Sequence, residues 1–335
     1  MPRIVKKTKQ IPDIILDYLD FCNYKNLSLK TTKSYHQTLM LFESYLREEK
    51  NIIDIRKIDK NIVEEYITFT KERGKYSYIT SNDAILKAHQ DSRTDIGTEI
   101  SEATLNNYLR NIKVFFTYLE ENSIISENKV KQCKFLKAPR KCKEQLTDYE
   151  YQKLIKSIDI TKFHEYRDYI ITNLIFDTGM RLGETLSLTI NDIDLIRRTI
   201  NISASASKSN RDRVVFYGMA MSKLLQQWLR FKDGMQESEL LFPTQRTNGL
   251  LTQSNFERNF RVYLSRSKIN KKITPHGLRN NFARRFLLAS KDIHTLSKLL
   301  GHSSITTTEK AYLDLMDDDF RKSYGKFSPL ENMNR

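Results

Sequence analysis

The amino-acid sequence predicts a mainly α-helical protein of two domains, with a small antiparallel β-sheet in the second domain. Apolar residues recur at helical spacing through much of residues 11–122, which is typical of a small helical bundle. Two segments rich in β-branched residues, 193–205 and 211–218, flank a polar turn and indicate the sheet. A basic stretch separates the two regions, and a chain of 335 residues is long enough for about two domains.

The first predicted domain, residues 1–125, contains several amphipathic helices joined by polar segments. Ser28 and Ser101 stand where N-cap residues are expected, because a serine hydroxyl can accept a bond from an unpaired helix N–H group. Residues 74–100 are polar and are predicted to form a loop. The predicted helices are 11–24, 29–48, 61–73 and 103–122.

Residues 126–145 are predicted to be a basic linker between the domains. Pro139 interrupts any helix in this stretch. A run of positive charge is usually a solvated surface, but at a junction between two domains of a basic chain contact with phosphates is the favoured interpretation. The basic residues concerned are Lys131, Lys134, Lys137, Arg140, Lys141 and Lys143.

The second predicted domain, residues 146–335, opens with a capping box formed by Thr147 and Glu150. Apolar spacing predicts further helices at 165–177, 221–232, 253–267, 276–290, 292–300 and 307–315. The tail after residue 315 carries aromatic residues on a polar background. It suits docking into a neighbouring subunit and packing on its own chain equally well.

The composition limits the classes of protein that the chain can belong to. Lys and Arg number 56 against 41 Asp and Glu, which gives a net charge of +15 and favours a polyanionic partner. The three cysteines are an odd number without a C-x-x-C pair, which argues against a disulfide framework or a structural zinc site and fits a reducing compartment. No apolar run is long enough to span a membrane, and the basic start lacks the apolar core of a signal peptide.

Two segments of the second domain carry basic side chains suited to binding a phosphate. Arg181 follows a glycine turn at a predicted helix start, where backbone N–H groups favour an anion. His276 and Arg279 are three positions apart on one predicted helix, so they share a face. Taken singly, each of these residues is more often a surface or packing residue, and only their combination indicates a site.

A third segment brings a histidine and a tyrosine together. Gly301 follows an apolar helix and is suited to the left-handed conformation that ends helices, which places His302 at a sharp turn. Thr306 and Glu309 form a second capping box, which predicts the start of the helix that carries Tyr312.

The second domain resembles the tyrosine recombinases, or phage integrases, over about residues 147–315. The resemblance lies in an ordered set of residue types, namely Arg181, Lys208, His276, Arg279, His302 and Tyr312. Glu184 is similar to an acidic residue that supports the first arginine in this family. The first domain resembles the core-binding domain of the family more weakly. The choice of Lys208 is open, because Arg211 and Arg213 are basic residues of the same turn.

The resemblance implies an enzyme that cleaves and rejoins DNA through a 3′-phosphotyrosyl intermediate, for integration, excision or resolution of DNA. Tyr312 is the expected nucleophile, and Arg181 and Arg279 are expected to bind the scissile phosphate. Lys208 is the expected general acid, while His276 and His302 are expected to assist proton transfer and phosphate binding. No metal ion, cofactor or ATP is expected. Tyr324 is a rival nucleophile by position alone.

The same resemblance implies the partners and the setting of the protein. It predicts a two-domain, C-shaped clamp around double-stranded DNA that carries a specific recombination site. Four subunits are expected to assemble on two such sites and to exchange strands through a Holliday junction. We expect a cytoplasmic protein of a mobile element or of the Xer type.

Three other functions stay open at the level of sequence. A type IB topoisomerase would use the same chemistry as a monomer without a defined site. A DNA-binding protein that has lost catalysis would be expected to have lost one of the arginines or the tyrosine. A metal-dependent nuclease would be inhibited by a chelator, and no acidic cluster in the sequence supports it.

Overall fold

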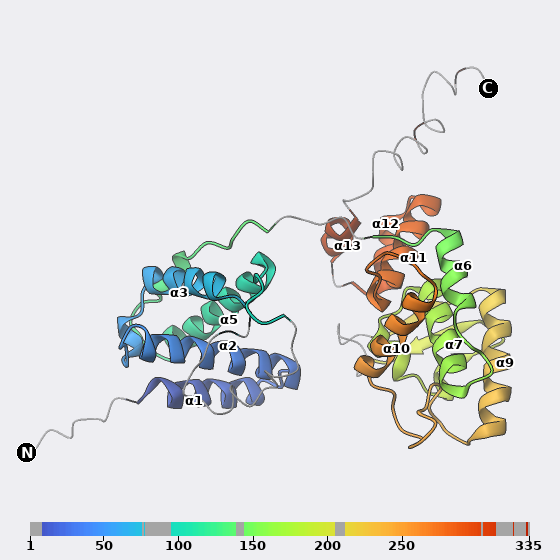
Figure 1. Ribbon diagram of the computed structural model, residues 1–335, viewed down its shortest axis with the longest axis horizontal. Coiled ribbons are helices and arrows are strands. Elements are labelled where there is room, and N and C mark those ends of the chain that lie inside the picture. The colour runs from blue at the N-terminus through green and yellow to red at the C-terminus, as the bar shows by residue number, and fades with distance from the viewer. Residues whose placement is uncertain are drawn as a thin grey trace, which may run out of the picture. The chain divides into compact units, whose positions relative to one another are not determined.

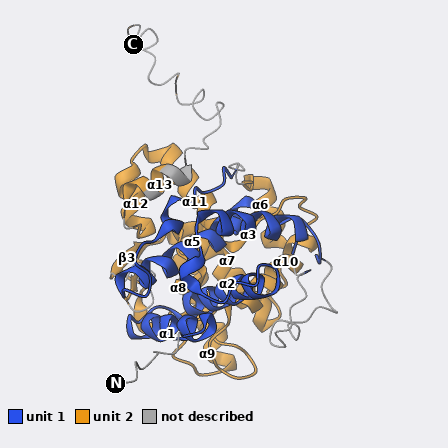
Figure 2. Ribbon diagram, turned by 90° about the vertical axis from the view of Figure 1, so that its left-hand side faces the viewer, with its two compact units in different colours: residues 1–140 blue, residues 141–335 orange. Residues whose placement is uncertain are grey.

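The computed structural model describes residues 9–75, 77, 95–138, 144–204, 212–302 and 304–312, together with the single positions 324 and 333 (Figure 1). The chain divides into two compact units, Met1–Arg140 and Lys141–Arg335, which Figure 2 colours separately. The division falls inside the stretch 126–145 that the sequence predicts to be the linker.

The regular elements of unit 1 are all helices over the residues that are described. Ser28 and Ser101 cap their helices as the sequence predicts, since each hydroxyl accepts a bond from the N–H group three residues later. Two short 3₁₀ helices, η1 (Ile55–Lys57) and η3 (Lys129–Gln132), join the longer elements. The α-helices are α1 (Ile11–Tyr24), α2 (Leu29–Glu48), α3 (Lys60–Arg73) and α5 (Glu102–Glu121).

Helix α5 forms the centre of unit 1, where it packs against α2 and α3. Its apolar stripe is buried, and Phe115 and Phe116 are each 1% exposed. The ring of Phe115 lies 5.2 Å from that of Tyr18 on α1 in an edge-to-face arrangement. The amphipathic spacing read from the sequence therefore identifies the face of α5 that becomes the core.

The segment after α5 is bound to that helix and is not an extended linker. The Asn106 side chain donates to the Leu136 carbonyl at 2.9 Å and accepts from the Leu136 N–H group at 2.8 Å. Lys113 Nζ donates to the carbonyls of Lys131 at 2.9 Å and Cys133 at 2.8 Å. These bonds satisfy main-chain groups that a free linker would leave to water. Residues up to Leu136 therefore belong structurally to unit 1.

Unit 2 combines eight α-helices in its described part with a small sheet. The capping box predicted at Thr147 and Glu150 is present at the start of its first helix. The helices are α6 (Asp148–Lys156), α7 (Phe163–Thr178), α8 (Leu182–Leu186), α9 (Met219–Met235), α10 (Gln253–Arg266), α11 (Pro275–Ser290), α12 (Ile293–Leu300) and α13 (Ile305–Tyr312). A 3₁₀ turn, η4 (Ile190–Asp192), precedes the sheet.

The sheet is antiparallel with the strand order β1-β2-β3. Strand β1 (Ile193–Asp194) and β2 (Thr199–Ile202) come from the segment that the sequence predicts to be one strand. Arg198, with φ of +56°, turns the chain between them. Strand β3 (Arg213–Phe216) pairs with β2 so that Ile202 lies opposite Arg213. The turn that contains Lys208 joins β2 to β3 and lies outside the described residues.

Helix α7 is the central element of unit 2. It packs against α9 and α11, and four of its apolar side chains are fully buried: Ile170, Ile171, Leu174 and Ile175. Trp228 of α9 is also fully buried, and its indole N–H donates to the Leu241 carbonyl at 2.8 Å. This core fixes the C-terminal end of α7, from which the candidate site begins.

The sequence also predicts no disulfide and no membrane span. Cys22 and Cys133 are buried free thiols, and burial raises the pKa of both. Cys142 lies outside the described residues. Across the described ranges, no helix is both long enough and apolar enough to cross a bilayer.

Candidate active site

The candidate site begins at the turn between α7 and α8. Gly179 ends α7 with φ of +68°, and its N–H donates to the Ile175 carbonyl at 2.9 Å. A Cβ atom at this position would lie 2.3 Å from the ring of Phe282, so both the conformation and the packing require glycine. The turn places Arg181 immediately before α8, at a helix start as the sequence predicts.

Arg181 is held by Glu184 on the first turn of α8. Arg181 Nη1 donates to Glu184 Oε1 at 2.8 Å, and the Arg181 backbone N–H donates to Oε2 at 3.0 Å. Arg181 Nη2 donates to the Gly301 carbonyl at 3.1 Å. The Glu184 side chain is 2% exposed, whereas that of Arg181 is 26% exposed. One edge of the guanidinium is therefore fixed by the protein, and part of the group stays open to solvent.

Arg279 is buried on α11 and is held mainly by backbone carbonyls. Its Nη1 donates to the Gly179 carbonyl at 2.7 Å, and its Nη2 donates to the Leu300 carbonyl at 2.8 Å. These two carbonyls belong to the ends of α7 and α12. The side chain thus joins the turn before Arg181 to the turn before His302. Helix α12 lies next to both α11 and α13 in Figure 1, in agreement with its contacts to each of them.

The turn after α12 positions His302. Gly301 ends α12 in the left-handed conformation, with φ of +64°, as the sequence predicts. His302 Nε2 lies 3.1 Å from Arg279 Nη2, and its Nδ1 lies 2.8 Å from Thr308 Oγ1 on α13. An arginine can only donate, so Nε2 is the acceptor and Nδ1 carries the proton that bonds to Thr308. This arrangement fixes His302 as one neutral tautomer.

The electrostatic surroundings of His302 favour the same neutral form. Burial is the largest cause that lowers the pKa of His302 to about 4, and the neighbouring charges of Arg279 and Arg181 act in the same direction. The charge of His276 also contributes to the lowering of the His302 pKa. His276 is exposed on α11, one turn before the buried Arg279. The two share a face of α11 as predicted, although only Arg279 is enclosed.

Helix α13 carries the candidate nucleophile as its last described residue. Tyr312 ends the helix, and its side chain lies outside the description. Thr308, one turn earlier, is fully buried and bonded to His302. The capping box predicted at Thr306 and Glu309 is wrong, because α13 already begins at Ile305. The hydroxyl that accepts from the Thr306 N–H belongs to Ser304, at 3.2 Å. A run of adjacent hydroxyl residues offers competing caps, which explains the shift.

The hairpin between β2 and β3 contributes a residue whose role the sequence does not reveal. Lys208, the predicted general acid, and Arg211 lie outside the described residues. Arg213 lies at the start of β3 and forms an ion pair with Glu184. The sequence offers Arg213 only as an alternative to Lys208. Its distance of 29 positions from Glu184 gives no local signal of their pairing.

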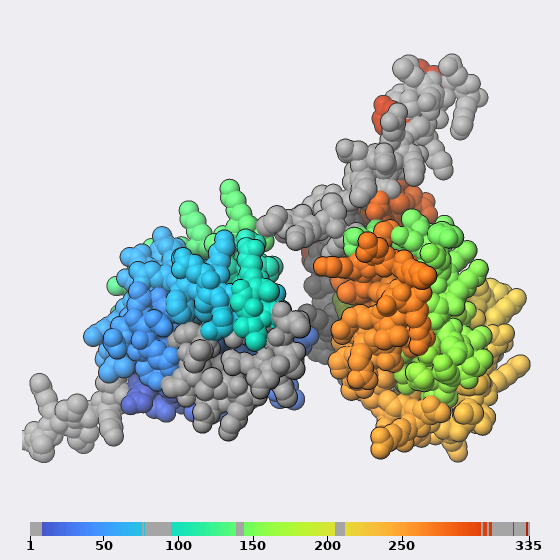
Figure 3. All heavy atoms as spheres, viewed as in Figure 1, coloured from blue at the N-terminus to red at the C-terminus, as the bar shows by residue number. Residues whose placement is uncertain are grey.

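The basic residues predicted to contact DNA differ in their surroundings. Lys131 forms an ion pair with Glu120, whereas Lys134 and Lys137 are exposed. The ring of the half-exposed Phe135 lies 5.2 Å from Lys113 Nζ. Side chains in the colour of residues just before 139 project from unit 1 in the space-filling view (Figure 3). The other predicted contacts, Arg140, Lys141 and Lys143, lie outside the described residues.

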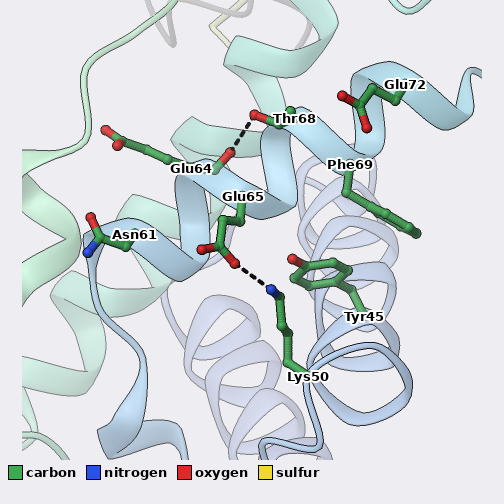
Figure 4. Close-up of a pocket in the computed structure, with 8 residues that line it drawn as sticks. All are labelled: Tyr45, Lys50, Asn61, Glu64, Glu65, Thr68, Phe69 and Glu72. Atoms are coloured by element: carbon green, nitrogen blue, oxygen red, sulfur yellow. Dashed lines mark hydrogen bonds and ion pairs between the residues drawn. The ribbon is translucent and has the colours of Figure 1, made fainter.

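Unit 1 also contains a hollow of ≈ 520 Å³ between α2 and α3 (Figure 4). Glu64, Glu65 and Glu72 line it, and Lys50 Nζ bonds to Glu65 at 2.5 Å. Tyr45 and Phe69 form its aromatic wall, with ring centroids 4.9 Å apart. An acidic lining repels phosphate groups, so this hollow is unsuited to contact with a nucleic-acid backbone.

The fold and the site define a class of protein before any comparison. Two guanidinium groups and a histidine gather beside a helix that ends in a tyrosine, an arrangement suited to binding a phosphodiester. Residues 144–318 match the model of the phage integrase family. The chain belongs to this family, and it is a tyrosine-type site-specific DNA recombinase, an enzyme that cleaves and rejoins DNA strands.

Relatives of known name are similar over nearly the whole chain. The tyrosine recombinase XerD of Listeria innocua is 24% identical over 323 residues, which cover 95% of this chain and 99% of that protein. The tyrosine recombinase XerC of Chlamydia caviae is 27% identical over 302 residues, which cover 88% and 90%. The Tn1549 transposon integrase, solved in complex with transposon right-end DNA, superposes with a TM-score of 0.73 at 16% identity. That match covers 96% of this chain and 100% of the other. This structural likeness supports the two-domain fold.

Proposed function

We propose that this protein recombines DNA at a specific site by forming a covalent bond between Tyr312 and the 3′ phosphate of a cleaved strand. The observation that supports this proposal best is the convergence of Arg181, Arg279 and His302 through the carbonyls at the ends of α7 and α12. These residues come from three separate segments, and the helix that carries Tyr312 is bonded to the same turn.

The arginines supply the charge that the reaction needs. Attack on a phosphodiester builds negative charge on the non-bridging oxygens, and guanidinium groups bind such oxygens with permanent charge and two parallel donors. In the proposed complex Arg181 binds through its solvent-exposed edge. Arg279 and the neighbouring His302 bind the second oxygen. An approaching phosphate raises the pKa of His302, which allows Nε2 to gain a proton and donate to the phosphate.

The proposed chemistry is a pair of transesterifications. The Tyr312 oxygen bonds to phosphorus, the bond from phosphorus to the 5′ oxygen breaks, and a 5′ hydroxyl leaves. One phosphodiester bond replaces another, so rejoining needs no ATP. The reverse attack by a 5′ hydroxyl of the partner strand releases Tyr312 and completes the exchange. Integration, excision and resolution of DNA all use this same step.

Proton transfer is assigned to the remaining residues of the predicted set. Lys208 would protonate the leaving 5′ oxygen, and His276 would accept or position the proton of Tyr312. The role of Lys208 has a specific chemical test. A substrate with sulfur in place of the 5′ bridging oxygen leaves as a thiolate, which needs no acid because a thiol ionises near pH ~8.5. Such a substrate should restore cleavage to Lys208→Ala.

DNA affinity and assembly complete the proposal. The exposed lysines before residue 139, together with the +15 charge, suit contacts with backbone phosphates. Several solved structures of similar fold are complexes with DNA, among them XerH bound to a palindromic difH substrate. We propose that four subunits of this protein bring two sites together, and that they act on DNA in the cytoplasm.

Covalent trapping tests the proposed function directly. The wild type, Tyr312→Phe and Tyr324→Phe are each incubated with nicked suicide DNA carrying the candidate site, in EDTA, and resolved on a denaturing gel. The proposal predicts adducts with the wild type and Tyr324→Phe and none with Tyr312→Phe. An adduct that survives Tyr312→Phe would move the nucleophile elsewhere. Binding of the site without any wild-type adduct would remove the catalytic proposal.

A further inference from the structure

Arg213 makes a buried ion pair with Glu184, the residue that also binds Arg181. Its Nη1 donates to Glu184 Oε1 at 3.0 Å and its Nη2 donates to Oε2 at 2.5 Å, so both carboxylate oxygens are engaged. The two side chains are 9% and 2% exposed. The planar fork of an arginine matches a carboxylate in this bidentate geometry, and burial distinguishes the pair from an ordinary surface salt bridge.

Glu184 therefore has two cationic partners. Its Oε1 accepts from both Arg181 and Arg213. Burial alone would raise the pKa of the Glu184 carboxyl, but the bonds and charges of Arg213 and Arg181 outweigh burial and hold that pKa below its usual value. With two arginines and one carboxylate, the group of three keeps a single net positive charge. Without Arg213, Glu184 would neutralise Arg181.

Arg213 also packs against the turn that positions His302. A Cβ atom on Gly301 would lie 2.9 Å from both Cδ and Nε of Arg213. The Nε atom is buried and has no acceptor among the described residues. The guanidinium is therefore enclosed between α8 and the end of α12, and its position suits an action on neighbouring residues more than a contact with DNA.

We propose that Arg213 is a positioning residue for strand cleavage, which acts by saturating Glu184 so that Arg181 keeps its charge for the scissile phosphate. This inference rests on the proposed function of the candidate active site. Arg213 bonds to both oxygens of the carboxylate, and the carboxylate then orients Arg181 without cancelling its charge. The role of Arg213 depends on its charge as well as on its shape. Without that charge, the Glu184 carboxylate would be an unbalanced anion near the phosphate.

The test compares Arg213→Gln, Arg213→Lys, Glu184→Gln and the double variant Arg213→Gln/Glu184→Gln in the full-length protein. DNA affinity is measured by titration, and the first-order rate of adduct formation is measured at saturating protein on the suicide substrate. Arg213→Gln should slow saturated cleavage by about tenfold or more, equivalent to about 1.4 kcal/mol, while DNA affinity changes little. Arg213→Lys should be intermediate, because it keeps the charge but loses the fork.

The double variant provides the readout that a merely structural role would not give. The Glu184→Gln change leaves a neutral amide with no charge to be balanced, so Arg213→Gln/Glu184→Gln should cleave faster than Arg213→Gln alone. Arg266→Gln is a matched control. It removes an arginine that bonds to the buried Glu165 at 2.7 Å near the other end of α7. This control should leave the saturated cleavage rate unchanged.

The outcomes separate this inference from the proposed function. A wild type that forms no adduct removes the proposed function itself. If the wild type forms the Tyr312 adduct, and Arg213→Gln and Arg213→Lys cleave as fast as the wild type, only the role of Arg213 is overturned. A double variant no faster than Arg213→Gln, or a loss confined to DNA affinity, also overturns it. Thermal unfolding of each variant shows whether it is folded. If Arg213→Gln is not folded, the cleavage rate of Arg213→Lys is compared with that of the wild type instead.

Discussion

Arg279 and Arg181 are the same residue type in one candidate site, but the protein holds them in different ways. Arg279 is 2% exposed and donates to the neutral carbonyls of Gly179 and Leu300. Arg181 is more exposed and donates to the buried carboxylate of Glu184. A neutral acceptor orients a guanidinium without reducing its charge, whereas a carboxylate orients it and reduces the charge that a phosphate experiences.

The difference shows what each way of holding an arginine requires. Arg279 needs the main chain of two helix ends to be in place, so its function is tied to the integrity of the fold. Arg181 is held by Glu184 on the first turn of α8 and by the Gly301 carbonyl, and in our proposal its carboxylate partner needs a second cation. Positive charge remains at the candidate site in both cases, with neutral acceptors around Arg279 and a second arginine beside the partner of Arg181.

The largest expected effects come from removing each arginine. Both Arg279→Gln and Arg181→Gln should slow cleavage by about 10²–10³-fold, the typical loss of one fixed charge-stabilising donor. Arg279→Gln should also reduce the free energy of unfolding by about 1–3 kcal/mol, because it leaves two buried carbonyls without this donor. Arg181→Gln should reduce it by less, because Arg213 still bonds to Glu184 and the Arg181 side chain is partly open to solvent. Cleavage assays and urea denaturation measure the two effects. Equal stability of the two variants would contradict the comparison.

The next effect concerns the turn that both arginines touch. Gly301→Ala should reduce the free energy of unfolding by about 1–2 kcal/mol through the left-handed backbone alone. It should also slow cleavage, because the new Cβ atom meets Arg213 at 2.9 Å. Gly97→Ala is the matched control, since Gly97 has φ of +72° and an added Cβ would meet nothing within 4 Å. If Gly301→Ala and Gly97→Ala behave alike in both assays, crowding of Arg213 has no consequence.

A smaller effect should appear in the pH dependence of stability. The pKa of His302 is lowered to about 4 by burial and by neighbouring charges, chiefly Arg279, whereas an unfolded histidine titrates near 6.5. Between these values the unfolded chain binds more protons. The stability from neutral His302 is therefore complete above about pH 6.5 and is lost as the pH falls towards 4.

Melting temperatures at about pH 7 and about pH 5, on either side of the unfolded pKa, measure this contribution. The wild type should lose more stability between the two values than His302→Gln, while His294→Gln, an exposed change on α12, should behave as the wild type. Parallel losses in all three proteins would show that His302 is not kept neutral by the fold.

The smallest expected effect extends the comparison to unit 1. Lys131 is bonded to Glu120, whereas Lys134 is exposed and makes no ion pair within the described part of the chain. If both contact DNA, Lys134→Ala should reduce the slope of log affinity against log salt by about 0.9, the value for one phosphate. Lys131→Ala should reduce it by less, because Glu120 already competes for that lysine. Equal changes in slope for the two variants would show that the bond to Glu120 does not weaken the contact of Lys131 with DNA.

The sequence predicts those parts of the site that depend on near neighbours. The capping box at Thr147, the left-handed Gly301 and the position of Arg181 at a helix start each involve residues within about four positions of one another. Such features follow from backbone geometry and can be read directly. The identity of Arg279 and His302 as site residues came from the order of residue types, which the family shares.

Features that depend on distant pairing could not be predicted from the sequence. The bond of Arg213 to Glu184 requires β3 to reach α8, and the fold decides this contact. The pairing of Asn106 with Leu136, 30 positions apart, binds part of the predicted linker to α5 in the same way. The split of one predicted strand at Arg198 also escapes prediction, because arginine carries little preference for a positive φ.

The bond between Thr308 and His302 has a consequence for the availability of the nucleophile. A single hydrogen bond stabilises by about 0.5–1.5 kcal/mol, and about 1.4 kcal/mol changes an equilibrium tenfold. In the proposed reaction, gain or loss of this one bond would shift an equilibrium between α13 held at this turn and α13 released from it by up to about tenfold. A contact made elsewhere on α13 would act on the same equilibrium, so an event of modest energy would set how often Tyr312, the proposed nucleophile, reaches the phosphate.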